Sequence, residues 1–182
     1  HALACWLTGG RVHSIDINMD ESGLTRFSGG LFCLIVPAGY IGSSLFGCIL
    51  LFTGFERRWS KYMAIVVSVI LAITCLLSGT IMTMIMSLGL AALLAAAFFY
   101  EDGKHTQYLI LFMGTCASTV SILNILSSTV FHTINGSDAT IFAKHCSILI
   151  PAFVYGIIWA VISVIMIMVT LLLAVRYTRP TL

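Results

Sequence analysis

Charged side chains are scarce in this chain of 182 residues. Lys and Arg together number 9 and Asp and Glu number 7, so 9% of the residues are charged while 59% are apolar. A soluble domain carries about 25% charged residues, because polar faces must cover its core. The composition therefore excludes a water-soluble domain of this size and predicts an integral, multi-pass membrane protein, without indicating which organelle.

Signals for nucleic acid, repeats and processing are also missing. No basic tract and no basic-aromatic interleaving indicates a nucleic-acid partner. No internal repeat, low-complexity segment or linker divides the chain, so residues 1–182 are predicted to form a single membrane-embedded domain. Thr8-Gly9-Gly10 interrupts the first apolar run, which argues against a removable signal peptide.

The cysteines give no sign of a disulfide framework. Six are present, at positions 5, 33, 48, 75, 116 and 146, and none forms a CxxC pair. Those at 33, 48, 75 and 116 lie within apolar runs, where cysteine usually behaves as a small hydrophobe. We therefore expect packing cysteines.

Long apolar runs occupy most of the chain. A helical crossing needs about 20 mostly apolar residues at about 1.5 Å each. The runs that meet or approach this length are Leu31–Gly54, Tyr62–Leu77, Met82–Tyr100, Gln107–Phe131 and Ile148–Val175. They predict an all-α polytopic membrane protein with about five visible transmembrane helices.

Residues 9–30 are too polar to cross a membrane. Val12, Ile15 and Ile17 nearly alternate with polar residues, and Asp20-Glu21-Ser22-Gly23 supplies turn chemistry. Alternation around a turn is typical of paired strands. The pattern predicts a small β-hairpin near residues 11–28.

The basic residues are unequally divided between the two ends of the predicted bundle. If the helices alternate in direction, one side carries six, namely Arg57, Arg58, Lys61, Lys104, Arg176 and Arg179. The side with the hairpin carries Arg11, Arg26 and Lys144. The positive-inside rule then places the hairpin side away from the cytoplasm.

The segment from Pro37 to Ser44 places a proline and several small residues inside the first predicted span. Gly39, Ser43 and Gly47 recur every four residues, a spacing that lets another helix approach closely. Tight packing at a proline kink is one interpretation. The other is a break in the helix that supplies polar groups to a buried site.

A polar connection near the C-terminal span contains Asn135-Gly136-Ser137-Asp138. Ser137 suits a helix N-cap and Asp138 the positive end of the helix dipole. Asp138 could instead be a ligand, and Asn135-Gly136-Ser137 also fits a glycosylation sequon. A metal cluster of His132, Asp138 and His145 is a further alternative.

Two more polar features have ordinary interpretations. The stripe of Asn124, Ser127 and Ser128 is typical of hydrogen bonds between membrane helices. His1 stands at the start of an apolar helical turn that Gly9 and Gly10 end, and alone it indicates no function.

Taken in order, several segments resemble a known family. They are His1-Ala2-Leu3-Ala4, Cys5-Trp6-Leu7-Thr8-Gly9-Gly10, Ser28-Gly29-Gly30, Pro37-Ala38-Gly39-Tyr40-Ile41-Gly42-Ser43-Ser44 and Asn135-Gly136-Ser137-Asp138-Ala139. Together they resemble the peptidase-like branch of the site-2 protease family, the intramembrane zinc metallopeptidases of plants, fungi and bacteria. The resemblance covers nearly the whole chain.

The resemblance implies a zinc site. In that family a membrane helix carries His-Glu-x-x-His, whose histidines bind zinc and whose glutamate activates a water, and a distant Asp completes the site. His1 matches the second histidine and Asp138 the distant aspartate, while Pro37, Gly39 and Asn135 are expected to line the site. The first histidine and the glutamate would precede His1, so the domain is expected to be N-terminally incomplete, with a truncated sixth helix. The fragment alone should be inactive.

The implied function is hydrolysis of peptide bonds in membrane-embedded substrates by the zinc-loaded full-length protein. Its expected partners are the lipid bilayer and transmembrane protein substrates; homo-oligomerisation is left open. Relatives tend to carry acidic residues where this chain has Asn124 to Ser128. The family also implies a site nearer the cytoplasm, against the charge distribution. A non-catalytic scaffold or chaperone is the alternative, followed by a small transporter, for which no charged residue is convincingly placed inside a span.

Overall fold

Long helices dominate the computed structural model, which describes residues 1–17, 23–130 and 152–178. A short helix, α1 (Ala2–Leu7), leads into the strands β1 (Arg11–Ile17) and β2 (Gly23–Ser28). The long helices are α2 (Phe32–Gly54), α3 (Arg57–Leu76), α4 (Ile81–Phe99), α5 (Lys104–Val130) and α7 (Ala152–Thr178). A 3₁₀ turn, η1 (Tyr100–Gly103), joins α4 to α5.

Within the described residues, five helices are long and apolar enough to cross a membrane, as the sequence predicts. Two of them begin earlier than expected, α3 at Arg57 and α5 at Lys104. Arg and Lys favour helix, and their long stems let the charge reach the interface while the backbone stays helical. Arg57 and Arg58 therefore lie in the first turn of α3, and Lys104 lies in that of α5.

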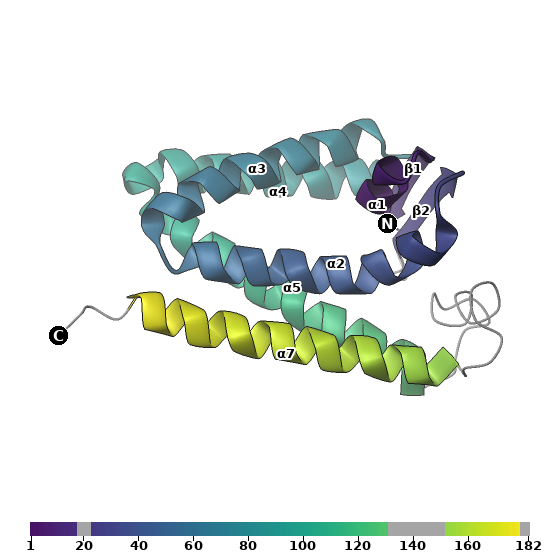
Figure 1. The fold of residues 1–182 in the computed structure, drawn as a ribbon. Coiled ribbons are helices and arrows are strands. Elements are labelled where there is room, and N and C mark those ends of the chain that lie inside the picture. Colours follow the sequence, from purple (N-terminus) through teal and green to yellow (C-terminus); the bar gives the residue numbers. More distant parts are fainter. Residues whose placement is uncertain (18–22, 131–151, 179–182) are drawn as a thin grey trace.

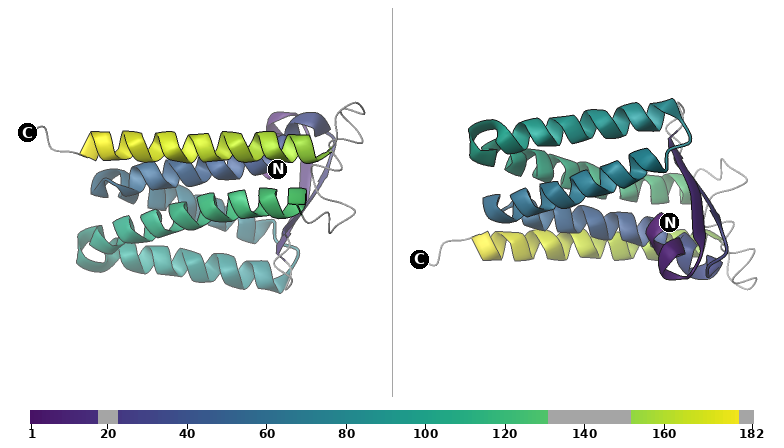
Figure 2. Two further views of the ribbon diagram at one scale, coloured as in Figure 1. Left: turned by 90° about the horizontal axis from the view of Figure 1, so that it is seen from below. Right: turned by 90° about the horizontal axis from the view of Figure 1, so that it is seen from above.

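The predicted hairpin is confirmed. β1 pairs with β2 in antiparallel register, with Val12 opposite Phe27 and Ile15 opposite Thr25, and an irregularity follows Val12. The hairpin and α1 lie across one end of the bundle, which we call the hairpin end (Figure 1). Views from above and below show the strands crossing that end toward the α3–α4 turn (Figure 2).

The long helices form two groups. α2, α5 and α7 pack against one another, and α3 and α4 pair on the other side of α2 and α5 from α7 (Figure 1). The first turns of α3 and α5 and the last turn of α7 lie opposite the hairpin, at what we call the basic end. Arg57, Lys104 and Arg176 belong to those turns.

The buried apolar residues divide into two clusters. One joins α2, α3, α4 and α5 and consists of Leu50, Ala64, Val67, Leu94 and Ile110. The other joins α2, α5 and α7 and consists of Val36, Ile125 and Trp159, with the Tyr40 ring packed on Trp159 at 5.4 Å. The second cluster anchors the hairpin end of α2, where the candidate site lies.

The distribution of side chains is that of a protein in lipid. Large apolar side chains such as Leu76, Phe99 and Leu172 are exposed at 86%, 82% and 68%. Ser44 and Ser163, in contrast, are completely buried. Lipid solvates the apolar surface, while small polar residues form close contacts between membrane helices.

α2 continues as one helix through Pro37, so the structure supports the packing interpretation rather than the alternative of a break in the helix. Inside a helix, proline removes one backbone hydrogen bond and crowds the carbonyl four residues earlier. Membrane helices tolerate this where neighbouring groups satisfy the freed carbonyl. Farther along, a Cβ added to Gly47 would lie 2.5 Å from Ser118 Oγ, and one added to Gly114 would lie 2.6 Å from Leu51 N. The backbones of α2 and α5 are therefore in close contact, as the small-residue spacing predicts.

One cysteine departs from the expectation of packing thiols. Cys33, in the first turn of α2, is disulfide-bonded. Cys5 and Cys48 are free and buried, as predicted, whereas Cys75 and Cys116 are free but not buried. Cys33 is exposed at the hairpin end rather than enclosed in the bundle. Cys146 lies outside the described residues.

Candidate functional site

His1 packs against the first turns of α2, although it precedes them by more than 30 residues. Its Nδ1 lies 2.9 Å from the carbonyl oxygen of Ile35. A carbonyl can only accept a hydrogen bond, so Nδ1 carries the proton and donates it. This tautomer makes Nε2 the nitrogen that could coordinate a metal.

Gly39 lies directly beneath the His1 ring. A Cβ added to Gly39 would lie 2.8 Å from Nδ1 of His1 and closer still to its Cε1 and Nε2. Pro37, two residues earlier in the same helix, is partly buried. The structure thus brings together His1 and Gly39, two of the predicted site residues.

A compact turn holds α1 in place. The Thr8 hydroxyl donates to the carbonyl of Ala4 at 2.8 Å, and Cys5 is completely buried. Gly30 has φ +79° and lies against Thr8, where an added Cβ would be 2.7 Å from the Thr8 Oγ1. Only glycine adopts that backbone conformation readily. The chain around Gly30 therefore fits under the end of α1.

The hairpin is tied to the α3–α4 turn by Asp16. Its carboxylate is buried, with Oδ1 accepting from the Gly79 N–H at 2.8 Å and Oδ2 from the Ser14 hydroxyl at 2.9 Å. The Ile15 N–H donates to the carbonyl of Leu77 at 3.0 Å. These contacts connect β1 to the turn between α3 and α4. The sequence pattern assigned Asp16 only to a strand.

Sequence reasoning also missed a hydroxyl cluster in the middle of the bundle. Ser44 of α2 lies 2.7 Å from Ser121 of α5 and 2.8 Å from Ser163 of α7, measured between hydroxyl oxygens. Ser43 joins it through Ser121 at 2.9 Å. Asn124, in the predicted polar stripe, is instead exposed. Small polar residues inside apolar runs were the available signal, but they do not reveal which helices meet.

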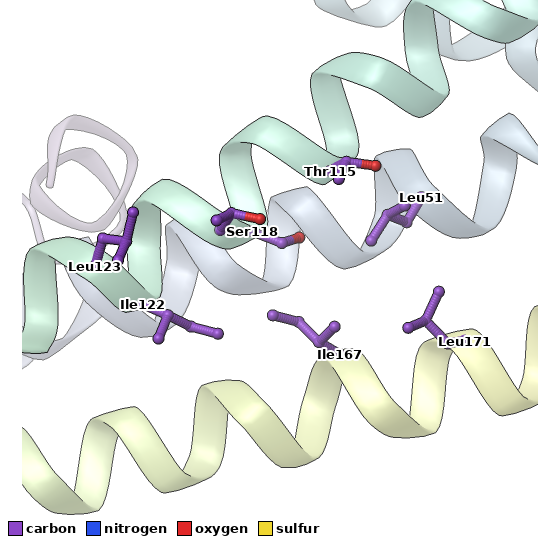
Figure 3. A pocket seen from close by; sticks show the side chains of 8 residues that line it. Leu51, Thr115, Ser118, Ile122, Leu123, Ile167 and Leu171 are labelled. Atoms are coloured by element: carbon purple, nitrogen blue, oxygen red, sulfur yellow. The ribbon is translucent and has the colours of Figure 1, made fainter.

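A cavity of about 320 Å³ opens between α5 and α7 (Figure 3). Its lining is mostly apolar and includes Leu51, Ile122, Ile167 and Leu171, with hydroxyls from Thr115 and Ser118. Leu51 and Leu171 lie in the halves of α2 and α7 that are nearer the basic end of the bundle, whereas His1 lies at the hairpin end. The cavity is therefore separate from the candidate site.

Of the two predicted zinc ligands, the structure describes His1. No group of three His, Cys, Asp or Glu side chains that could hold a metal lies within residues 1–17, 23–130 and 152–178. Asn135, Asp138, His132 and His145 fall outside those ranges. The geometry at His1 nonetheless suits a metal ligand, because ligating histidines usually donate their second ring nitrogen to a carbonyl or carboxylate.

Comparison with protein families identifies the class of the molecule. The family model described as Peptidase M50B-like matches residues 1–170. The chain belongs to that family and so to the site-2 proteases, an assignment that agrees with the resemblance of its motifs. Comparisons with curated proteins and with solved structures find no match.

Proposed function

We propose that the complete gene product is a zinc metallopeptidase that hydrolyses peptide bonds in membrane-embedded substrates. The observation that supports it best is the His1 ring, which donates through Nδ1 to the Ile35 carbonyl at 2.9 Å and so presents the tautomer of a metal-binding histidine. Family membership supports the same chemistry, since the family is zinc-dependent in general.

The residues of this chain would have distinct roles. His1 and Asp138 would be zinc ligands, and Pro37, Gly39 and Asn135 would line the site. Zinc, when bound, would supply Lewis-acid polarisation of the scissile carbonyl. The general base would be the glutamate of a His-Glu-x-x-His motif ending at His1.

The surroundings of His1 suit a substrate that arrives through lipid. Leu3 and Leu7 of α1 are exposed at 67% and 79%, so the helix that carries His1 presents an apolar surface. Ile35, whose carbonyl lies 2.9 Å from the His1 ring, is completely buried. One side of α1 is thus compatible with lipid and the other with the packed interior.

The test uses the complete gene product in detergent or proteoliposomes. Zinc content and cleavage of a membrane-spanning reporter are measured for wild type, His1→Ala and Asp138→Asn. We expect both substitutions to abolish cleavage and to reduce bound zinc, because zinc catalysis usually needs three protein ligands.

Matched controls are available at the basic end. His105→Ala changes an exposed histidine in the first turn of α5, and Asp102→Asn changes an aspartate in η1. Both controls should keep wild-type zinc content and cleavage. Cleavage that survives Asp138→Asn unchanged would refute the role of Asp138, and a wild type without zinc or cleavage would favour a non-catalytic relative.

A further inference from the structure

We infer that Gly39 is a positioning residue for the candidate metal site: the absence of a side chain at position 39 lets the His1 ring lie against α2 with Nδ1 at the Ile35 carbonyl. The inference rests on the proposed zinc function for its catalytic meaning. The contact itself is a property of the fold.

The geometry leaves no room for any other residue at position 39. An added Cβ would be 2.8 Å from Nδ1 and nearer still to Cε1 and Nε2, so it would collide with ring atoms rather than with a flexible chain end. Real Cβ atoms essentially never lie closer than 3.0 Å to a non-bonded heavy atom of another part of the chain. An imidazole ring is rigid, so it would have to move as a whole.

Moving the ring would disturb its hydrogen bond as well. Ile35 is one helical turn before Gly39, so its carbonyl and the Gly39 Cα lie on the same side of α2. The ring contacts both at once, with Nδ1 at 2.9 Å from the Ile35 oxygen. A side chain at 39 would push the imidazole away from this acceptor and change the direction in which Nε2 points.

Gly42 provides a matched control in the same helix. A Cβ added there meets no atom within 4 Å. Gly39→Ala and Gly42→Ala therefore make the same chemical change and the same gain in helix propensity. Only the first places a methyl group against His1.

The first experiment measures Co²⁺ binding, by titration and by the visible absorption spectrum of the ion, on the complete gene product. Gly39→Ala should weaken Co²⁺ binding by roughly 10- to 100-fold, as removal of a supporting contact to a metal ligand does, and it should alter the absorption bands. Gly42→Ala should bind as wild type does. Wild-type affinity and an unchanged spectrum in Gly39→Ala would overturn the inference.

The second experiment measures thermal stability without metal and tests the contact through a double-mutant cycle. Gly39→Ala should lower the melting temperature in the wild-type background. In the His1→Ala background the ring is gone, so Gly39→Ala should leave the melting temperature unchanged or raise it. An equal loss in both backgrounds would overturn the inference, because Gly39 would then not act through His1.

The two experiments separate this inference from the proposed function. A wild type that binds no Co²⁺ would refute the proposed function and, with it, the catalytic meaning given to Gly39. A wild type that binds Co²⁺ while Gly39→Ala binds it equally would leave the proposed function standing and refute the role of Gly39 alone.

Discussion

Replacement of Ser44 by alanine removes a single hydroxyl group, but it should destabilise the bundle more than the loss of one atom suggests. The Ser44 hydroxyl is completely buried and lies 2.7 Å from the hydroxyl of Ser121 and 2.8 Å from that of Ser163. The variant loses both of these contacts between helices. Ser121 keeps a contact with Ser43 at 2.9 Å, so the loss falls mainly on Ser163.

The size of the effect follows from the two contacts. Hydrogen bonds between membrane helices contribute about 0.6 kcal/mol each on average, which amounts to about 1.2 kcal/mol for two. A hydroxyl left unsatisfied in the interior costs about 1 kcal/mol more. We expect the free energy of unfolding to fall by about 2 kcal/mol.

The assay is reversible unfolding by SDS in mixed micelles, followed by tryptophan fluorescence, since Trp159 is buried beside this cluster in α7. Ser68→Ala is the matched control, because its hydroxyl donates at 2.8 Å to Ala64 within its own helix. A loss in Ser44→Ala no larger than that in Ser68→Ala would refute the reasoning. So would the absence of coupling between Ser44→Ala and Ser163→Ala in a double-mutant cycle.

Two other contacts give independent predictions. Gly47→Ala should lower the free energy of unfolding by about 1–3 kcal/mol through overpacking, because the added Cβ would lie 2.5 Å from Ser118 Oγ. The control is Gly89→Ala, whose added Cβ would have no atom within 4 Å. It should be neutral or stabilising in the same SDS assay. Asp16→Ala should speed hydrogen exchange at the Gly79 amide, which it leaves without the 2.8 Å acceptor. Arg26→Ala should not, because Arg26 is exposed and 3.9 Å from the carboxylate; equal exchange in both variants would refute the role of Asp16.

Local patterns predicted much of the fold correctly. The hairpin followed from alternation around a turn, and the helices followed from apolar length, because both signals depend on neighbouring residues. The helix starts at Arg57 and Lys104 were misplaced, since polar residues at a membrane interface are compatible with either a loop or a first turn. The disulfide of Cys33 was missed because an apolar context does not reveal whether another thiol is near.

The candidate site, like the fold, was predictable from the sequence only in part. His1, Pro37 and Gly39 were predicted from the resemblance of short motifs, and the structure places His1 against both the Ile35 carbonyl and Gly39. The spacing of Gly39, Ser43 and Gly47 indicated a close-packing face, but that face meets two different elements. Gly39 contacts His1, the residue before α1, whereas Ser43 and Gly47 contact α5.

The sequence by itself determined that this is a polytopic membrane protein with a hairpin at one end. Composition and periodicity indicate whether each segment lies in lipid or in water. Only the tertiary structure decided the partners: His1 with Ile35, Asp16 with Gly79, and Ser44 with Ser163. Each pair joins residues far apart in the chain, and a small or polar residue is compatible with many neighbours. Which one it meets depends on how all the helices pack together.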